Sequence, residues 1–256
     1  MRRFLRIPKI QMIVALLFIY GSFLIHELTW QNLLHLVLSI FFSVFFDLIF
    51  LKIKRLNLFF PSAAIVTGLI VGLITPISLP WNEIIIVCFL ASLSKQLLRY
   101  NQHHIFNPAG LGVFFGSLIF RHEVSWQAVS FQRPVFDNVF LFISFILLFF
   151  TGYVSQLKMR RFYNALAFLL VYVLLSRNLL NLLDPTILFF VFVMLPEPMT
   201  TPVKKLPQIL FGAIVAVFSF FTAHPLIVQT VPIFSLVPDG LIFALLIGNL
   251  VFLKYK

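Results

Sequence analysis

The segment HHIFNPAGLG, residues 103–112, places polar and conformationally special residues between two strongly apolar stretches. Asn107 is suited to cap a helix that begins at Pro108, because an asparagine side chain accepts hydrogen bonds from free backbone N–H groups. Ala109, Gly110 and Gly112 allow another helix or a planar ligand to approach closely. The segment therefore predicts either a capped helix packed through small residues or a ligand site.

Basic residues precede this segment, and they favour the second interpretation. We expect Lys95 and Arg99 to lie one turn apart on one helix, with His103 and His104 at the same rim. A helix N-terminus carries about half a positive charge and unpaired N–H groups. Together these groups predict a site for an anion, either a phosphate or a reduced flavin ring.

Three further stretches carry polar groups where apolar sequence prevails. In LPEPMTTPVKK, residues 195–205, the side chains of Glu197, Thr200 and Thr201 could offer oxygen atoms to a ligand. The alternative is that this stretch is an ordinary loop. Asp239 is placed to cap a helix near residue 240, and capping alone would explain it. Thr67 lies in a stretch of small residues whose first role is helix packing, although Thr67 can also face a ligand.

The composition requires that helices in a membrane position these residues. The chain has 256 residues, of which 61% are hydrophobic and 11% charged, and a soluble domain cannot bury so much apolar surface. Apolar stretches of helical length recur between turn residues, which favours an all-α polytopic membrane protein and not an outer-membrane barrel. We expect ten helices, at about 11–28, 33–51, 60–75, 81–99, 107–120, 136–156, 161–176, 180–195, 206–223 and 238–253.

The basic residues predict how these helices are oriented. With the N-terminus inside, sixteen of the nineteen Lys and Arg residues fall on the inner side, and only Arg121, Arg133 and Arg177 fall outside. We therefore expect a multi-pass protein of the cytoplasmic (inner) membrane with both termini cytoplasmic. Trp30, Trp81 and Trp126 would then be anchors at the outer interface.

A weak internal repeat divides this single membrane domain, residues 1–256, into two halves. NPAGLGVFFGSLIF (107–120) resembles VPDGLIFALLIGNL (237–250), and LITP ending at Pro76 corresponds to MLPEP ending at Pro198. Because each half holds five helices, the halves, about 10–120 and 136–253, would be inverted across the membrane. The two Pro-containing helix starts would then meet from opposite sides.

Several function classes find no support. The positive charge of +11 sits in short clusters between spans, so it does not indicate nucleic-acid binding. The lone Cys88 gives neither a disulfide nor a cysteine-rich metal site, and His26 and His35 make a poor haem pair. Asp47, which we expect near Lys52, is the main carboxylate inside a span, so a self-contained proton pump is not indicated. Neither hydrolase spacing nor a nucleotide loop is present.

Together, these stretches resemble the NqrB/RnfD family, the membrane subunits of the sodium-pumping NADH:quinone oxidoreductase and of the Rnf complex. The resemblance is carried by SAAIVTGLIVGLITP, then HHIFNPAGLG, then PEPMTTP, and last VPDGLIFALLIGN, in the family's order. It implies two inverted five-helix repeats, similar to the urea-transporter architecture, and a flavin-bearing electron-transfer subunit.

The resemblance also implies where flavin would and would not bind. Relatives attach FMN through a Thr in an outer Ser/Asp-Gly-Ala-Thr motif, but residues 121–138 contain neither the motif nor any Thr, so covalent FMN is not expected. A non-covalent flavin, riboflavin or FMN, is expected around Asn107 and Pro108, with Phe106 and Phe114 as apolar walls.

The expected function is that of one electron-transfer subunit of a membrane oxidoreductase complex, in which electron transfer can be coupled to ion transport. Its expected partners are the lipid bilayer, other membrane and cytoplasmic subunits, an extracytoplasmic FMN-carrying protein and quinone. Two alternatives stay open: a small-solute channel or transporter of the same architecture, and a cofactor-free subunit that only docks partners.

Overall fold

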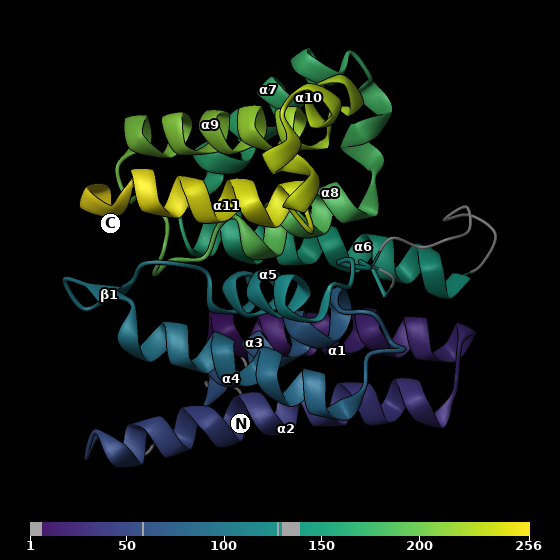
Figure 1. The fold of residues 1–256 in the computed structure, drawn as a ribbon, viewed down its shortest axis with the longest axis vertical. Helices are drawn as coiled ribbons and strands as arrows, with labels where there is room; N and C mark the ends of the chain where they lie inside the picture. Colours follow the sequence, from purple (N-terminus) through teal and green to yellow (C-terminus); the bar gives the residue numbers. More distant parts are fainter. Residues whose placement is uncertain (1–6, 58, 127, 130–138) are drawn as a thin grey trace.

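The structure is a computed structural model that describes residues 7–57, 59–126, 128–129 and 139–256 (Figure 1). Helices dominate it, as the sequence predicts. The elements of the first half are α1 (Pro8–His26), α2 (Trp30–Ile53), α3 (Ser62–Ile74), α4 (Trp81–Leu97), β1 (Arg99–Tyr100), β2 (His103–His104) and α5 (Pro108–Phe120).

The second half has more breaks than the first. Its helices are α6 (Val139–Tyr153), α7 (Phe162–Ser176), α8 (Pro185–Phe189), α9 (Lys205–Ala223), α10 (Pro225–Thr230) and α11 (Gly240–Val251). Two π-helical segments, Val154–Lys158 and Phe190–Met194, continue α6 and α8. Short 3₁₀ turns cover Leu179–Leu183, Pro232–Leu236 and Leu253–Tyr255.

Each of the ten predicted ranges contains a helix, but one range is not continuous. The stretch predicted at 180–195 is a 3₁₀ turn, the short helix α8 and a π-helical segment. The break falls at Asp184, whose Oδ1 accepts a hydrogen bond of 2.7 Å from the backbone N–H of Thr186 and so caps α8. Helix α10 was not predicted, and the start of the range 136–156 lies outside the described residues.

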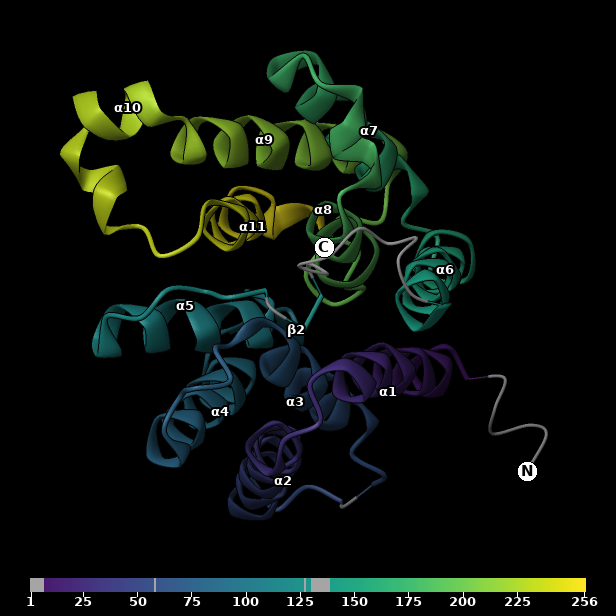
Figure 2. The same cartoon turned by 90° about the vertical axis from the view of Figure 1, so that its right-hand side faces the viewer.

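The helices form two groups that face each other (Figure 2). In the first group α2 packs against α3 and α4, and α4 packs against α5; in the second, α9 packs against α7 and α11. Contacts of α1 with α6 and of α5 with α11 join the groups. The core between them is apolar, and Phe114 lies against Phe243 with ring centroids 6.0 Å apart.

Within the described residues, three helices are long and apolar enough to cross a membrane, namely those at Pro8–Ile25, Trp30–Ile53 and Lys205–Ala223. Shorter apolar helices accompany them. Large side chains such as Phe18 and Phe41 are more than half exposed on the outer faces, which water would not favour and lipid tails do. The chain is therefore a helical membrane protein.

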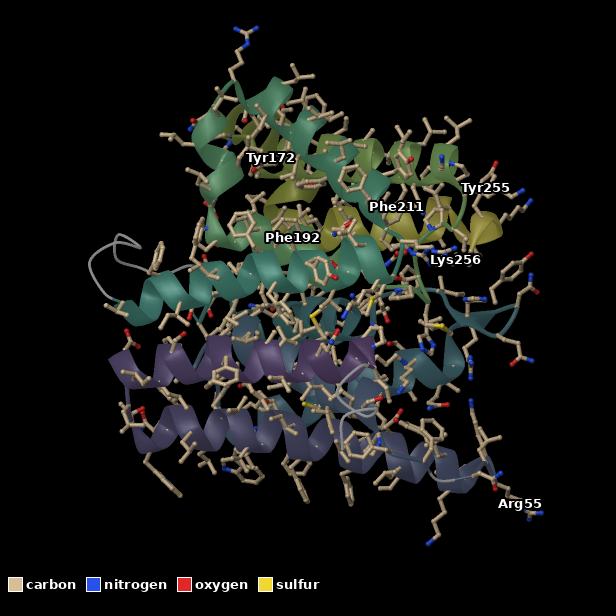
Figure 3. All side chains as sticks on the ribbon, turned by 180° about the vertical axis from the view of Figure 1, so that it is seen from behind. Arg55, Tyr172, Phe192, Phe211, Tyr255 and Lys256 are labelled. Carbon is tan, nitrogen blue, oxygen red and sulfur yellow. The ribbon has the colours of Figure 1, made fainter. Side chains whose placement is uncertain are left out.

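Lysine and arginine side chains gather at one end of the molecule, called here the basic end. It comprises the start of α1, the ends of α2 and α4, and the segments around residues 160 and 256 (Figure 3). The Lys54 Nζ donates to Gln96 O (2.6 Å), and the Lys158 Nζ donates to Gln11 Oε1 (2.6 Å). These contacts tie neighbouring helices together at the basic end.

Glycine allows the closest helix contacts in both groups. A methyl group at Gly112 on α5 would lie 2.6 Å from the Val87 carbonyl oxygen of α4. A methyl group at Gly212 on α9 would overlap the Asn164 carbonyl oxygen of α7. The predicted small-residue packing of α5 is thus confirmed, and the partner at Gly112 is a helix.

We expect Gly212→Ala to lower the free energy of unfolding by about 1–3 kcal/mol, because the added methyl group must push α7 and α9 apart. Thermal unfolding in detergent micelles would measure it. Gly21→Ala on α1 is the matched control, since nothing lies within 4 Å of its added Cβ. It should leave stability unchanged or raise it by up to about 1 kcal/mol. Equal effects of the two substitutions would refute the packing explanation.

Candidate functional site

An internal cavity of about 160 Å³ lies at the basic end, where the two helix groups meet. The start of α5 forms one wall, α1 and α3 form another, and residues 193–199 with the π-helical end of α6 close it. An engineered protein cavity of about 150 Å³ holds one benzene molecule. This cavity can therefore enclose one end of a larger ring system, with the rest in its mouth.

The start of α5 is fixed by Asn107, a buried residue that is 3% exposed. Its Oδ1 accepts a hydrogen bond of 3.0 Å from the Gly110 N–H, so the predicted cap is confirmed. Its Nδ2 donates to the Met194 carbonyl oxygen (3.2 Å), at the end of the π-helical segment after α8. One side chain thus caps a helix of the first group and holds it against the second.

Methionines make up much of the apolar wall. Met12, Met159 and Met199, three of the five methionines in the chain, line the cavity together with Val66, Ile70 and Val193. Methionine side chains adapt to irregular shapes, and their sulfur atoms make favourable contacts with aromatic rings. The wall therefore suits a flat aromatic ligand.

Two π-helical segments shape the wall on the second group. Ser155 lies in one of them and lines the cavity, and Val193 lies in the other. The Gln156 Nε2 donates to the Val191 carbonyl oxygen (3.2 Å), which links the two segments. Such segments are rare and frequently occur at functional sites.

The loop that carries Glu197 is braced from behind. The Glu197 carbonyl oxygen accepts a hydrogen bond from the Thr201 hydroxyl (2.8 Å), and the Thr200 hydroxyl donates to Glu197 Oε2 (3.2 Å). Arg161, which is 6% exposed, donates from Nε to Thr201 Oγ1 (2.8 Å) and from Nη2 to the Pro198 carbonyl oxygen (3.1 Å). Burial lowers the pKa of this guanidinium. Glu197 itself lines the cavity.

Burial is the largest cause of the pKa shifts of the ionisable groups in and beside the cavity. It raises the pKa of Glu197 to about 7, although the Thr200 hydroxyl and Lys9, Lys256 and Lys95 act in the opposite direction. Burial also lowers the pKa of His104 to about 4, with smaller contributions from Lys95 and Arg99, so this imidazole is neutral at neutral pH. Burial lowers the pKa of Lys256 to about 8, opposed by Glu197.

Lys95 forms an ion pair that the sequence did not reveal. Its Nζ lies 2.7 Å from Asp47 Oδ1, and the Asp47 side chain is only 2% exposed. The Gln96 amide also donates to this carboxylate (3.4 Å). The prediction that Asp47 lies beside Lys52 was therefore wrong. The two residues are close in sequence, but Asp47 faces α4 while Lys52 is exposed.

The structure brings some of the residues proposed from sequence to the cavity. Those that line it are Thr67, Lys95, His104, Asn107, Pro108, Ala109 and Glu197. Thr200 and Thr201 stand behind Glu197. Gly110 faces Met194 and Ile242 instead, and Phe106 and Phe114 pack in the core outside the cavity lining.

Arg99 and Asp239 do not line the cavity, although Arg99 pairs with the cavity-lining His104 in the small sheet. Helix α4 ends at Leu97, so Arg99 belongs to β1 and not to that helix; its Nη2 donates to Gln102 O (2.7 Å). Asp239 caps α11 at the end opposite the basic end, where its Oδ1 accepts from the Ile242 N–H (2.7 Å). Burial raises the pKa of this carboxyl.

Trp126 was predicted to anchor the protein at the membrane interface, and this prediction is wrong, because its ring lies over Asp239 inside the protein. The indole Nε1 donates to Asp239 Oδ2 (2.7 Å), and Trp126 is 6% exposed. Trp30 and Trp81, by contrast, are exposed as expected of interfacial residues. Trp126 differs from them in its partners, since its ring also lies against Phe189, with ring centroids 6.2 Å apart.

Sequence reasoning missed Lys9, Met12, Ser155, Met159 and Lys256. All but Lys256 line the cavity, and the Lys256 Nζ donates to the Ile105 carbonyl oxygen just before α5. No local motif distinguishes these residues. A charge at the start of α1 and methionines near a helix end are common features of any membrane helix.

The fold and cavity define a helical membrane protein with a cavity at the contact of two helix groups. The chain belongs to the NQR2, RnfD, RnfE family, whose model matches residues 5–139. This confirms the resemblance found in the sequence.

Two curated relatives are each named as a subunit of an ion-translocating oxidoreductase complex. The one from Buchnera aphidicola subsp. Schizaphis graminum is 31% identical over 122 residues, which cover 46% of this chain and 35% of the relative. The one from Buchnera aphidicola subsp. Baizongia pistaciae is 30% identical over 112 residues, 42% of this chain and 31% of the relative. The matched part thus spans about a third of these relatives.

Proposed function

We propose that this chain is an electron-transfer subunit of an ion-translocating membrane complex, and that its cavity holds the ring of a non-covalent flavin. The observation that carries the proposal is the start of α5, whose capped end opens on an apolar, methionine-lined cavity between the two helix groups. The names of the relatives support the complex, and the cavity supports the ligand.

The residues present fit a flavin ring. Backbone atoms at the start of α5 and the ammonium groups of Lys9 and Lys95 offer hydrogen bonds and positive charge to ring carbonyls. Met12 and Met159 offer soft apolar contact to the ring faces. When bound, the flavin would supply one- and two-electron redox chemistry. The protein's part is to orient the ring and keep bulk water away from it.

We further propose ten membrane spans in two inverted repeats of five, with the basic end in the cytoplasm. The helix contacts support a repeat, because the two halves share one pattern. In the first half α4 contacts α2 and α5, and in the second half α9 contacts α7 and α11. Helices α5 and α11 also begin at opposite ends of the molecule. In each, the side chain of the capping residue accepts a hydrogen bond from the backbone N–H three residues further along the chain. The excess of Lys and Arg at the basic end supports the orientation.

The purified protein tests this function directly. We expect it to carry yellow flavin absorbance that denaturation releases into solution, which shows a non-covalent cofactor. A colourless preparation that binds no added riboflavin or FMN would refute the proposal. If that colourless protein moved small solutes into liposomes, the channel alternative would replace it.

Replacing Asn107 by leucine should weaken flavin binding by up to about thirtyfold, because the variant loses the cap and the hydrogen bond to Met194, each worth about 1 kcal/mol. Fluorescence titration of the flavin-free protein measures the change. Asp239→Leu is the matched control, since it removes a cap of the same kind at the opposite end. Weaker binding in both variants would indicate general destabilisation and contradict the site.

A further inference from the structure

Glu197 is the one carboxylic acid among the described residues that line the cavity. Its Oε2 accepts a hydrogen bond from Thr200, and its backbone is fixed through Thr201 and Arg161. The side chain is therefore held in place at the wall where the proposed ring would lie. Electron transfer through a flavin does not by itself explain an acid at this position.

Three lysines lie near enough to act on Glu197, but none of the cations that the structure describes pairs with it directly. Lys9 on α1, Lys95 on α4 and Lys256 all act on it, and His104 of β2 is neutral. Within the described residues no cation lies within the 4.0 Å of a salt bridge to Glu197. Lys95 is held by Asp47, and Lys256 donates to the Ile105 carbonyl oxygen.

These conditions place the pKa of Glu197 near neutral pH, where its protonated and ionised forms are both populated. Burial disfavours the carboxylate and raises the pKa to about 7, while the lysines keep it from rising further. A small change in nearby charge therefore changes the proton occupancy near neutral pH. A negative charge about 6 Å away raises the proton affinity about a hundredfold at the effective dielectric of protein sites.

Resting on the flavin site proposed above, we propose that Glu197 is the proton acceptor that compensates an electron arriving in the cavity. The electron would come from a one-electron donor subunit, and the flavin, when bound, would supply the group that accepts it. One proton from the solvent at the basic end binds a carboxylate oxygen of Glu197 and forms a carboxylic acid. When the electron leaves, the O–H bond breaks and the proton returns to solvent, so charge balances in both directions.

The exposed Lys9 lines the same cavity and marks its solvent side. Proton exchange there requires no path through the membrane core. Proton uptake by Glu197 therefore differs from the action of a proton pump, because the proton enters and leaves at the same end of the protein. Its effect is to stabilise the added electron in a site of low polarity.

Infrared difference spectroscopy on the flavin-loaded protein, poised oxidised and then reduced at an electrode, tests the proposal. We expect a carboxylic-acid C=O band to appear on reduction at neutral pH and to shift in D₂O. Glu197→Gln should lose the band, whereas Glu197→Asp should keep it at an altered frequency. Thr200→Val should also shift it, because Thr200 donates to Glu197.

Glu83→Gln is the matched control, because Glu83 lies in the first turn of α4, outside the cavity lining. That variant should keep the wild-type band. If flavin binds and no band appears, or if the band persists in Glu197→Gln, the inference is overturned while the proposed function stands. If the protein binds no flavin, both are overturned.

Discussion

Replacing Lys95 by methionine is expected to lower the free energy of unfolding by about 3–5 kcal/mol, the cost of leaving a buried carboxylate without its partner. Asp47 is 2% exposed, and among the residues that the structure describes its carboxylate receives one long amide hydrogen bond besides its ion pair. Water cannot replace the lost ammonium at that depth. Thermal unfolding in detergent, together with the yield of folded protein, would measure the loss.

The double variant Lys95→Met, Asp47→Asn distinguishes the ion pair from simple loss of packing. It removes both charges, so most of the lost stability should return. Asp47→Asn alone should be milder, because the Lys95 side chain is 13% exposed and its ammonium can turn toward water. Lys52→Met, at the exposed neighbour in sequence, should cost at most about 0.5 kcal/mol. A double variant no more stable than Lys95→Met would contradict this account.

Features that depend on a few neighbouring residues could be predicted from the sequence. The caps at Asn107 and Asp239 were predicted because both the capping side chain and the N–H that it binds lie within three residues. The helix ranges followed because apolar stretches and breakers are local signals. The family followed from several such stretches in a fixed order.

Features set by contacts between distant residues could not be predicted. Asp47 and Lys95 are 48 residues apart, and no pattern in either helix selects the partner. The π-helical segments beside the cavity depend on how α6 and α8 pack, which composition does not reveal. Arg161 and Thr201 are likewise 40 residues apart, so the bracing of the Glu197 loop was missed.

The repeat proposed from sequence and the observed caps also differ in register. Alignment of Pro108 with Pro238 pairs Asn107 with Val237, whereas the caps pair Asn107 with Asp239. The two starts differ in surroundings as well, since α5 opens on the cavity and Trp126 covers the start of α11. The side chains packed against each helix start therefore decide which of the two opens on a cavity.

Replacing Arg161 by alanine should weaken flavin binding at least a hundredfold and lower the free energy of unfolding by about 3 kcal/mol. The guanidinium makes two hydrogen bonds, to Thr201 Oγ1 and the Pro198 carbonyl oxygen, and bonds to charged groups contribute about 1.5–3 kcal/mol each. Without them residues 196–201 lose their brace, and Glu197 and Met199 leave the cavity wall. Hydrogen–deuterium exchange of this loop and fluorescence titration of flavin would detect both effects.

Two variants distinguish the effect of the two Arg161 hydrogen bonds from the effect of its positive charge. Arg161→Lys keeps the positive charge but cannot make both bonds from one planar group, so it should recover only part of the binding. Arg160→Asn removes a charge from the exposed neighbouring side chain, and asparagine tolerates the left-handed backbone there (φ 57°). It should bind flavin as the wild type does. Full recovery in Arg161→Lys, or equal loss in Arg160→Asn, would mean that positive charge at the basic end, and not the fixed loop, holds the ligand.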